Sequence, residues 1–298
     1  MKKIKIVFFA IACMAITTAF SQDDKKATEN KPAKCPMQIT DAGFSFGGFF
    51  QKSPVGSFTD FQLLNPQSVL LSGNMQGYTV SKGFGNIGGP VFDAGIGIAM
   101  RDKENTNSVS NTQLRIGISF LGLNMSDYLS KTDRVPYDTL TSSQTGQTIY
   151  SDSVTYHSYN MNYTSQQVRC DISVIYRTNP AARWSVYGGI GFEAGKSITA
   201  YTDIDYNESS SIIPSNGISA AYNDDKSRTE RIINKNNYGY AAYLPLGIDF
   251  RVGTKREFFK QLHLFYEARP FINYNNIPEL GTTGGLGVKI RFGLRVTI

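Results

Sequence analysis

Histidine, cysteine and tryptophan are scarce in this chain: its 298 residues include two histidines, three cysteines and one tryptophan. A serine hydrolase needs a histidine beside a serine and an acid. Neither His157 nor His263 has an evident partner of this kind, so the chain is not predicted to be an enzyme. Cys13 lies in the N-terminal apolar segment, and the other two cysteines, Cys35 and Cys170, do not make a disulfide framework, although a single bridge between them stays open.

Long hydrophobic runs are absent after the first 21 residues. No later window approaches the ~18 consecutive apolar residues of a membrane-spanning helix, which excludes such a helix from the rest of the chain. Residues 1–21 are predicted to be a secretory signal peptide, because three lysines precede the apolar run Ile6–Ala19. Small residues at Ala19 and Ser21 favour cleavage before Gln22.

A strong excess of one charge is also missing. The chain has 30 Lys and Arg and 24 Asp and Glu, and three of the lysines leave with the predicted signal peptide. The remaining 27 basic and 24 acidic groups are nearly balanced, which does not support binding of nucleic acid. Residues 22–39 are polar, rich in lysine and interrupted by Pro32 and Pro36, so they are predicted to be a flexible periplasmic leader.

The last thirteen residues contain the most regular pattern in the chain. From Leu286 to Ile298 every even position is apolar, and every odd position is glycine, threonine or a cation. A period of two places alternate side chains on opposite faces of an extended strand. One face is therefore apolar, and the other carries Lys289, Arg291 and Arg295.

This strand is too long for an ordinary β-sandwich, in which about five or six residues are usual. Thirteen residues tilted by ~40° rise ~33 Å, which is enough to cross the hydrocarbon of a bilayer. A strand can lie in lipid only when both of its edges are hydrogen-bonded, so it is predicted to belong to a closed barrel. A long strand in a soluble β domain is the alternative.

Seven further segments alternate in the same way. With the last strand, the predicted strands are 40–51, 87–101, 113–125, one that ends at 177, 183–201, 237–252, 261–274 and 286–298. Long connections follow the first, third and fifth strands, at 52–86, 126–154 and 202–235, and Pro270 is expected to end or bulge the seventh. The sequence therefore predicts an all-β fold: an eight-stranded antiparallel up-and-down transmembrane β-barrel over 40–298 with long extracellular loops.

The polar parity of these strands predicts a charged interior. It carries five acids and eight bases: Asp93, Arg101, Arg115, Arg169, Asp171, Glu193, Asp249, Arg251, Glu267, Arg269, Lys289, Arg291 and Arg295. Eight strands leave an interior that side chains can fill, so a lumen closed by charge pairing is the favoured interpretation. A narrow pore that weakly favours anions is the alternative. Cys170 shares the apolar parity of its strand, which favours a buried or lipid-facing thiol.

The first long connection is unusually apolar for an exposed loop. It contains Phe58, Phe61, Leu63 and Leu64, followed by a second apolar group at 69–71. Either it folds back over the barrel mouth as a cap, or it presents an apolar surface to a protein partner.

Three short motifs resemble ligand sites without meeting their requirements. The G-x-G-x-x-G string at 83–88 lacks a preceding strand and a following helix, and the Gly195-Lys196-Ser197 triplet lacks the glycine of a phosphate loop. The acids of 203–207 resemble the start of a calcium loop, but Glu208 stands where the turn glycine belongs. No cofactor or metal site is predicted, although a loose external cation site at 203–207 stays an alternative.

The signal end Ala19-Phe20-Ser21 before Gln22, the eight alternating segments and the closing strand Val288–Ile298 together resemble the outer-membrane β-barrel domain family that is common in Bacteroidota. The resemblance covers about 40–298. It implies a place in the bacterial outer membrane, in contact with its lipid, and supplies no catalytic residue. A structural role, or interaction through the external loops, is expected. A small channel for small solutes is the second hypothesis, and an outer-membrane lipid hydrolase is the third.

Overall fold

The computed structural model describes residues 37–52, 55–73, 75–81, 86–101, 109–141, 143–144, 146, 148–179, 182–214, 220–253 and 256–298. The predicted signal peptide, the predicted leader up to residue 36, Cys35 and the side chain of Arg101 lie outside this description. The described residues belong to one compact unit, Pro36–Ile298. None of its described helices is long and apolar enough to cross a bilayer.

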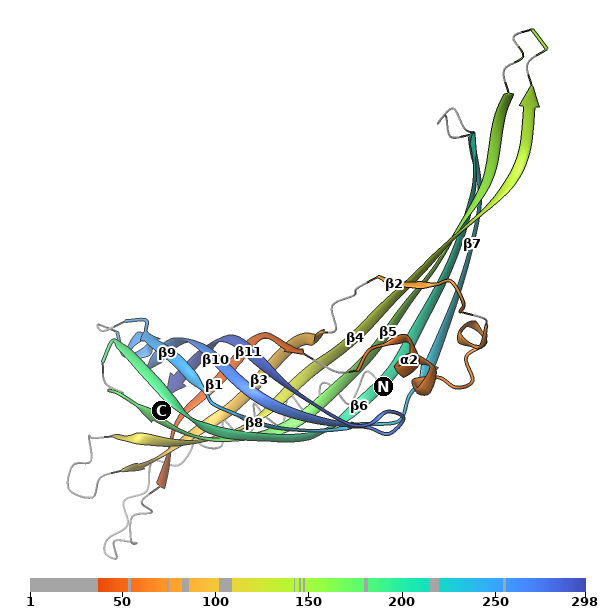
Figure 1. Cartoon of the computed structure of the whole chain (residues 1–298). Helices are drawn as coiled ribbons and strands as arrows, with labels where there is room; N and C mark the ends of the chain where they lie inside the picture. Colours follow the sequence, from red (N-terminus) through yellow and green to blue (C-terminus); the bar gives the residue numbers. More distant parts are fainter. Residues whose placement is uncertain are drawn as a thin grey trace, which may run out of the picture. The chain divides into compact units, whose positions relative to one another are not determined.

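Antiparallel strands close into a ring (Figure 1). They are β1 (Met37–Lys52), β3 (Asn86–Arg101), β4 (Val109–Thr141), β5 (Thr148–Arg177), β6 (Trp184–Pro214), β8 (Tyr238–Tyr243), β9 (Leu246–Arg251), β10 (Leu262–Ile277) and β11 (Gly281–Thr297). Pairing of β11 with β1 closes the ring. Since β8 and β9 lie end to end between β6 and β10, they count as one strand, and the predicted eight-stranded up-and-down barrel is confirmed.

Side-chain exposure alternates along the strands as predicted. On β11, Ile290 and Phe292 are 37% and 43% exposed, whereas Lys289 and Arg291 are 4% and 5% exposed. Phe292 pairs with Phe46 of β1, and their ring centroids are 6.1 Å apart on the outer face. The ring therefore has an apolar outside and a charged inside.

Pro245 and Pro270 lie on adjacent strands at the point where β8 ends and β9 begins. Contrary to the prediction, Pro270 neither ends nor bulges its strand, because β10 continues to Ile277 in regular register with β11. The interruption lies on the neighbouring strand at Pro245, where Leu244 N donates to Pro270 O at 3.0 Å. A proline has no N–H to donate, and it is tolerated here because the strand beside it is broken.

Two of the three predicted long loops are largely strands. Residues 126–141 continue β4 and 148–154 begin β5, while β6 runs to Pro214 and β7 (Ala220–Ile233) returns beside it. The outward parity, which is apolar in the barrel, is mostly polar along these extensions, so the alternation that marks the barrel is lost. Backbone pairing and residues that suit a pleated sheet, such as threonine, tyrosine and valine, still make strands.

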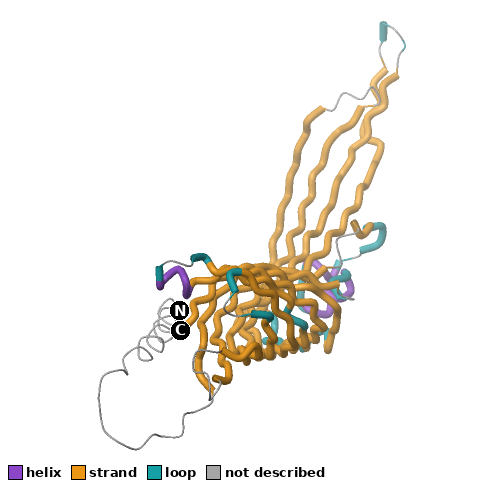
Figure 2. The backbone as a smooth tube through the Cα atoms, turned by 90° about the vertical axis from the view of Figure 1, so that its left-hand side faces the viewer, coloured by secondary structure: helices purple, strands orange, loops and turns teal. Residues whose placement is uncertain are grey.

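These extensions form a four-stranded sheet outside the ring. Pairing of β3 with β4 reaches only Asn124, and pairing of β8 with β6 reaches only Lys196. Beyond those points β4, β5, β6 and β7 pair only among themselves, apart from the short β2 (Thr79–Ser81) on β4 (Figure 2). The external sheet comprises residues 124–141, 148–164, 199–214 and 220–233.

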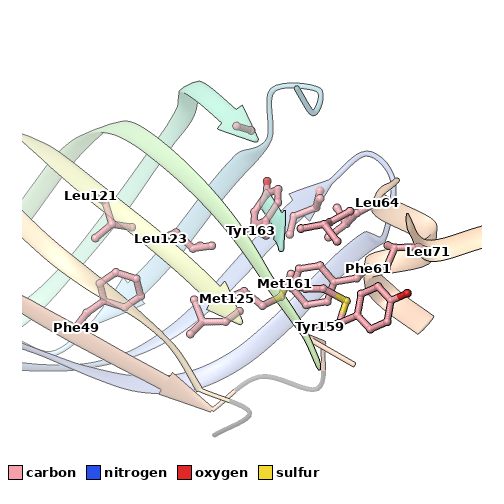
Figure 3. Close-up of a cluster of buried hydrophobic side chains, with 14 of the residues drawn as sticks. Phe49, Phe61, Leu64, Leu71, Leu121, Leu123, Met125, Tyr159, Met161 and Tyr163 are labelled. Atoms are coloured by element: carbon pink, nitrogen blue, oxygen red, sulfur yellow. The ribbon is translucent and has the colours of Figure 1, made fainter. Parts of the chain in front are cut away.

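The first connection contains two short helices and packs into the barrel mouth. Helix α2 (Phe58–Leu64) begins with a capping box in which Ser57 and Asp60 bond each other's backbone N–H, and η1 (Leu70–Ser72) follows. Figure 3 shows Phe61 and Leu64 beside side chains of the barrel wall, and they are 0% and 2% exposed. Ser68 donates to Glu230 of β7, and Asn234 donates to Leu64 O, so residues 57–72, the cap, lie over the mouth as the first of the two interpretations expected.

Candidate functional site

Glu267 on β10 is the centre of an ionic cluster inside the barrel. The residue is 0% exposed, and its carboxylate accepts hydrogen bonds from Arg115 at 2.8 Å, Arg291 at 2.6 Å and Tyr187 at 2.7 Å, with Arg269 also in contact. Three cations around one buried carboxylate supply the charge-assisted bonds that offset its loss of water.

A second ionic layer lies next to the first, toward the mouth. Glu193 contacts Lys289 at 2.5 Å and Arg269 at 3.2 Å, and Asp171 contacts Arg269 and accepts a hydrogen bond from Tyr243 at 2.6 Å. Glycine makes room for these large groups, because a Cβ on Gly191 would strike the ring of Tyr243. The predicted pairing of charges across the lumen is thus observed among the described residues.

His263 lies inside the barrel near the short turns, as predicted, but it does have a partner. Its Nδ1 is 2.5 Å from Asp249 Oδ1, and Arg295 lies 3.0 Å away. In the described part of the chain no hydrogen bond joins a serine hydroxyl to this histidine.

Two further charged residues at this end of the lumen, Asp41 and Arg177, were not predicted from the sequence. Arg295 contacts Asp41 at 3.3 Å, and Arg177 contacts Asp249 at the same distance. Asp41 shares the parity of the inward Ser45 on β1, and Arg177 shares that of the inward Ser173 on β5, so the same alternation could have found both.

The half of the lumen next to the cap is apolar, which sequence reasoning also missed. Its inward side chains form one buried cluster with Phe61, Leu64 and Leu71 of the cap, and Figure 3 shows Met161 beside the cap residues. They include Phe49, Val91, Leu121 and Leu123 of the ring, and the cluster continues onto the external sheet with Met125, Met161, Tyr163 and Ile204. The signal was present on β4, where the inward parity changes from polar to apolar at Leu121.

Little space remains between the ionic and the apolar halves. A gap of about 10 Å³ is lined by Arg169, Glu193, Lys289, Phe49 and Phe271 among others. That volume is about the minimum that holds one water molecule. Glu193 Oε2 is buried beside this gap without a hydrogen-bond partner, so one water is the occupant that fits.

An aromatic and ionic cluster joins the external sheet to the first connection. His157 Nδ1 lies 2.8 Å from the hydroxyl of Tyr206, which donates to Glu208 at 2.8 Å, so His157 Nδ1–H is the donor to Tyr206. Asp133 lies 3.4 Å from the other ring nitrogen of His157. The ring of Tyr78, which precedes β2, packs on this group from the first connection.

The tyrosines of this cluster are held neutral. Burial raises the pKa of Tyr78 to about 12. Burial, together with the hydrogen bond to Glu208, also raises the pKa of Tyr206. Hydrogen bonds from Tyr206 and Lys226 lower the pKa of Glu208. Phenols that stay protonated make poor nucleophiles, so the cluster is suited to fixing the sheet rather than to attacking a substrate.

Of the motif look-alikes, residues 83–85 of the G-x-G-x-x-G string lie outside the described residues, whereas the acids of 203–207 are described. Asp203 and Asp205 lie on strand β6, where Arg231 binds Asp203 at 2.6 and 2.7 Å and Thr229 donates to Asp205 at 2.8 Å. The arginine occupies the carboxylate that a loose cation site would need. No cluster of metal-ligating side chains is found in the described part of the chain.

Aromatic side chains border the apolar outer face at both ends. Near the short turns, Trp184 and Phe258 are 62% and 63% exposed, the latter on the short helix α3 (Glu257–Gln261). Near the mouth, Phe50 and Tyr274 are 61% and 54% exposed. An apolar band between two aromatic girdles is typical of a barrel that spans a bilayer.

No model of a known protein family and no curated protein matches this sequence. Among solved structures, Ail, the attachment invasion locus protein of Yersinia pestis, in complex with the heparin analogue sucrose octasulfate, shares 13% identity over 87% of this chain and 99% of its own, with a TM-score of 0.27. Neisserial surface protein A shares 11% identity over 87% and 97%, also at 0.27. The outer membrane protease OmpT of Escherichia coli shares 9% over 92% and 99%, at 0.23. These likenesses are weak, and the fold rests on the strand pairing described above.

Proposed function

We propose that this chain is an integral protein of the bacterial outer membrane whose role is structural or depends on interactions of its external parts. The observation that supports this most strongly is the apolar outer face of a closed ring that keeps its charges inside. In water such a continuous apolar surface would drive aggregation, whereas in lipid it is satisfied, and closure leaves no unpaired strand edge in hydrocarbon.

Membrane extraction tests this proposal. The chain with its own N-terminus would be expressed in a Gram-negative host, and the envelope fractions would be washed with salt and then with detergent. We expect it in the outer-membrane fraction, released only by detergent. A chain that stays in solution without detergent would contradict the proposal.

A small channel is the second hypothesis, and the filled lumen argues for a closed barrel instead. A conducting path would have to pass both the ionic layers around Glu267 and the cap. Planar-bilayer recordings should therefore show no steady current from the native chain. A steady anion-selective current that changes in Arg169→Ala or Arg291→Ala would favour the channel.

Lipid hydrolysis is a weaker hypothesis. His157 and His263 both contact acidic side chains and neither bonds to a described serine hydroxyl, so release of fatty acid by the purified protein is not expected.

A protein partner on the first connection is also a weaker hypothesis. Phe61 and Leu64 are already buried in the chain itself. Leu63, which is 54% exposed, and the partly buried Phe58 are the side chains that such a partner could reach.

A further inference from the structure

The outward face of β4 and β5 in the external sheet is polar without being charged. Five cross-strand pairs follow one another there, and each of the ten side chains is a hydroxyl, an amide or a tyrosine. The pairs, here called the polar face, are Asn124↔Thr164, Ser126↔Asn162, Tyr128↔Asn160, Ser130↔Ser158 and Thr132↔Tyr156. Most exposed protein surfaces mix charges of both signs, so this composition is distinctive.

The polar face directly continues the lipid-facing surface of the barrel. On β4 and β5 the outward parity is unbroken, and the last apolar pair, Phe120↔Val168, lies two pairs below Asn124↔Thr164. From Asn124 to Thr132 the strand extends about 27 Å. With the apolar surface in hydrocarbon, as proposed above, the face begins where the hydrocarbon ends and rises through the layer of the outer-leaflet headgroups.

The hydrogen-bonding groups of this face are free for a ligand. None of the ten side chains makes a hydrogen bond to another described residue, whereas on the adjoining β6 and β7 the acids are taken up by Arg231 and Thr229. Tyr128 and Tyr156 are 41% and 49% exposed and present ring surface beside the amides. Short hydroxyl and amide side chains and rigid tyrosines lose little conformational entropy on binding.

We infer that the polar face binds the carbohydrate chains of the glycolipid in the outer leaflet, an inference that rests on the proposed outer-membrane location. Sugar hydroxyls both donate and accept hydrogen bonds, as do the hydroxyl and amide side chains of the face. The apolar face of a sugar ring can pack on a tyrosine. The absence of cations on the face excludes a phosphate group as the main determinant.

Titration of the chain in phospholipid nanodiscs tests the inference. The probe is the delipidated polysaccharide of a smooth lipopolysaccharide, and heat release reports binding. We expect saturable binding that the double variant Tyr128→Ala with Asn160→Ala weakens about tenfold or more. The matched control Val135→Ala, on the opposite parity of β4 and 60% exposed, should bind as the native chain does. Raising the salt concentration should change the affinity little, because no ion pair is involved.

Several outcomes would overturn the inference. They are absence of saturable binding, equal binding by the double variant, and equal binding of dextran, a neutral polymer that is not part of the membrane. Variant folding is read from the gel mobility of unheated samples, and Asn124→Asp, which only adds a charge, should weaken binding if the double variant misfolds. Insertion into nanodiscs is measured first. Failure to insert would refute the proposed function as well, whereas insertion without polysaccharide binding refutes this inference alone.

Discussion

Glu267 shows how much of the stability of this barrel depends on single buried charges. Glu267→Gln keeps the shape of the side chain but leaves Arg115, Arg269 and Arg291 facing a neutral amide at a fully buried position. Breaking a buried ionic cluster in this way typically costs about 3–5 kcal/mol. We expect a loss of that order in the free energy of unfolding, measured by urea titration of the barrel in lipid vesicles.

An exposed pair on the external sheet serves as the control for this measurement. Asp203→Asn breaks the contact with Arg231, whose side chain is 64% exposed. Water screens such pairs, so the unfolding midpoint should move far less than in Glu267→Gln. Equal effects of the two substitutions would contradict the assignment of Glu267 as a structural centre.

Tyr78 gives a pH dependence that can be measured. Its pKa is raised from 10.0 to about 12, so the neutral phenol is favoured in the folded chain. The stabilisation is fully present below about pH 10 and is lost as the pH rises through about 12. In ultraviolet titration, the difference between the native chain and Tyr78→Phe should show one phenol that ionises near pH 12. Ionisation near pH 10 would mean that the cluster around His157 does not enclose it.

At the scale of elements, the cap makes the clearest prediction. Phe61 is 0% exposed inside the mouth, and replacing a buried phenylalanine by alanine usually costs about 3–5 kcal/mol. Phe61→Ala should lower the temperature at which the folded, fast-migrating band disappears from gels. Leu63→Ala, two residues further along the same helix and 54% exposed, should leave that temperature almost unchanged. If only Leu63→Ala mattered, the first connection would be a docking surface and not a cap.

The outer part of the β4–β5 hairpin should be separable from the barrel. Removing 133–155 and joining Thr132 to Tyr156 by an Asn-Gly turn keeps every pair of the ring, because β3 pairs with β4 only as far as Asn124. We expect the shortened chain to insert and to resist heat nearly as the native chain does. Failure to assemble would show that the hairpin takes part in forming the ring.

The sequence predicted elements well where the outward face is in contact with lipid and poorly where that face meets water. Period-two alternation identified all the barrel strands because lipid demands apolar side chains on one parity. Beyond Asn124 and Thr164 that demand ends, so the strands of the external sheet look like polar loops. The change of the inward parity to apolar at Leu121 and Leu123 could be read from the sequence, but which distant loop joins their buried cluster could not.

For the whole molecule, closure of the ring and the opposite character of its two faces could be derived from the sequence, but the filling of the lumen could only partly be derived. The charged residues were placed inside by parity, yet their partners depend on which strands face each other across the barrel. Asp249, for example, joins His263, Arg177 and Arg295 from three other strands. Such sets follow from three-dimensional placement and not from spacing along the chain.

Thiol labelling on β5 is the most direct test of the claim that apolar side chains face hydrocarbon and charged ones face inward. Cys170 is exposed on the outer face, whereas Ser173 on the same strand is 2% exposed inside. With Cys35→Ser in both, the native Cys170 would be compared with Ser173→Cys in a Cys170→Ser background, each carrying a fluorophore in vesicles of brominated phospholipid. Strong quenching at 170 and weak quenching at 173 is the expected result. Equal quenching at both positions, or ready labelling of Cys170 by a charged, membrane-impermeant reagent, would contradict it.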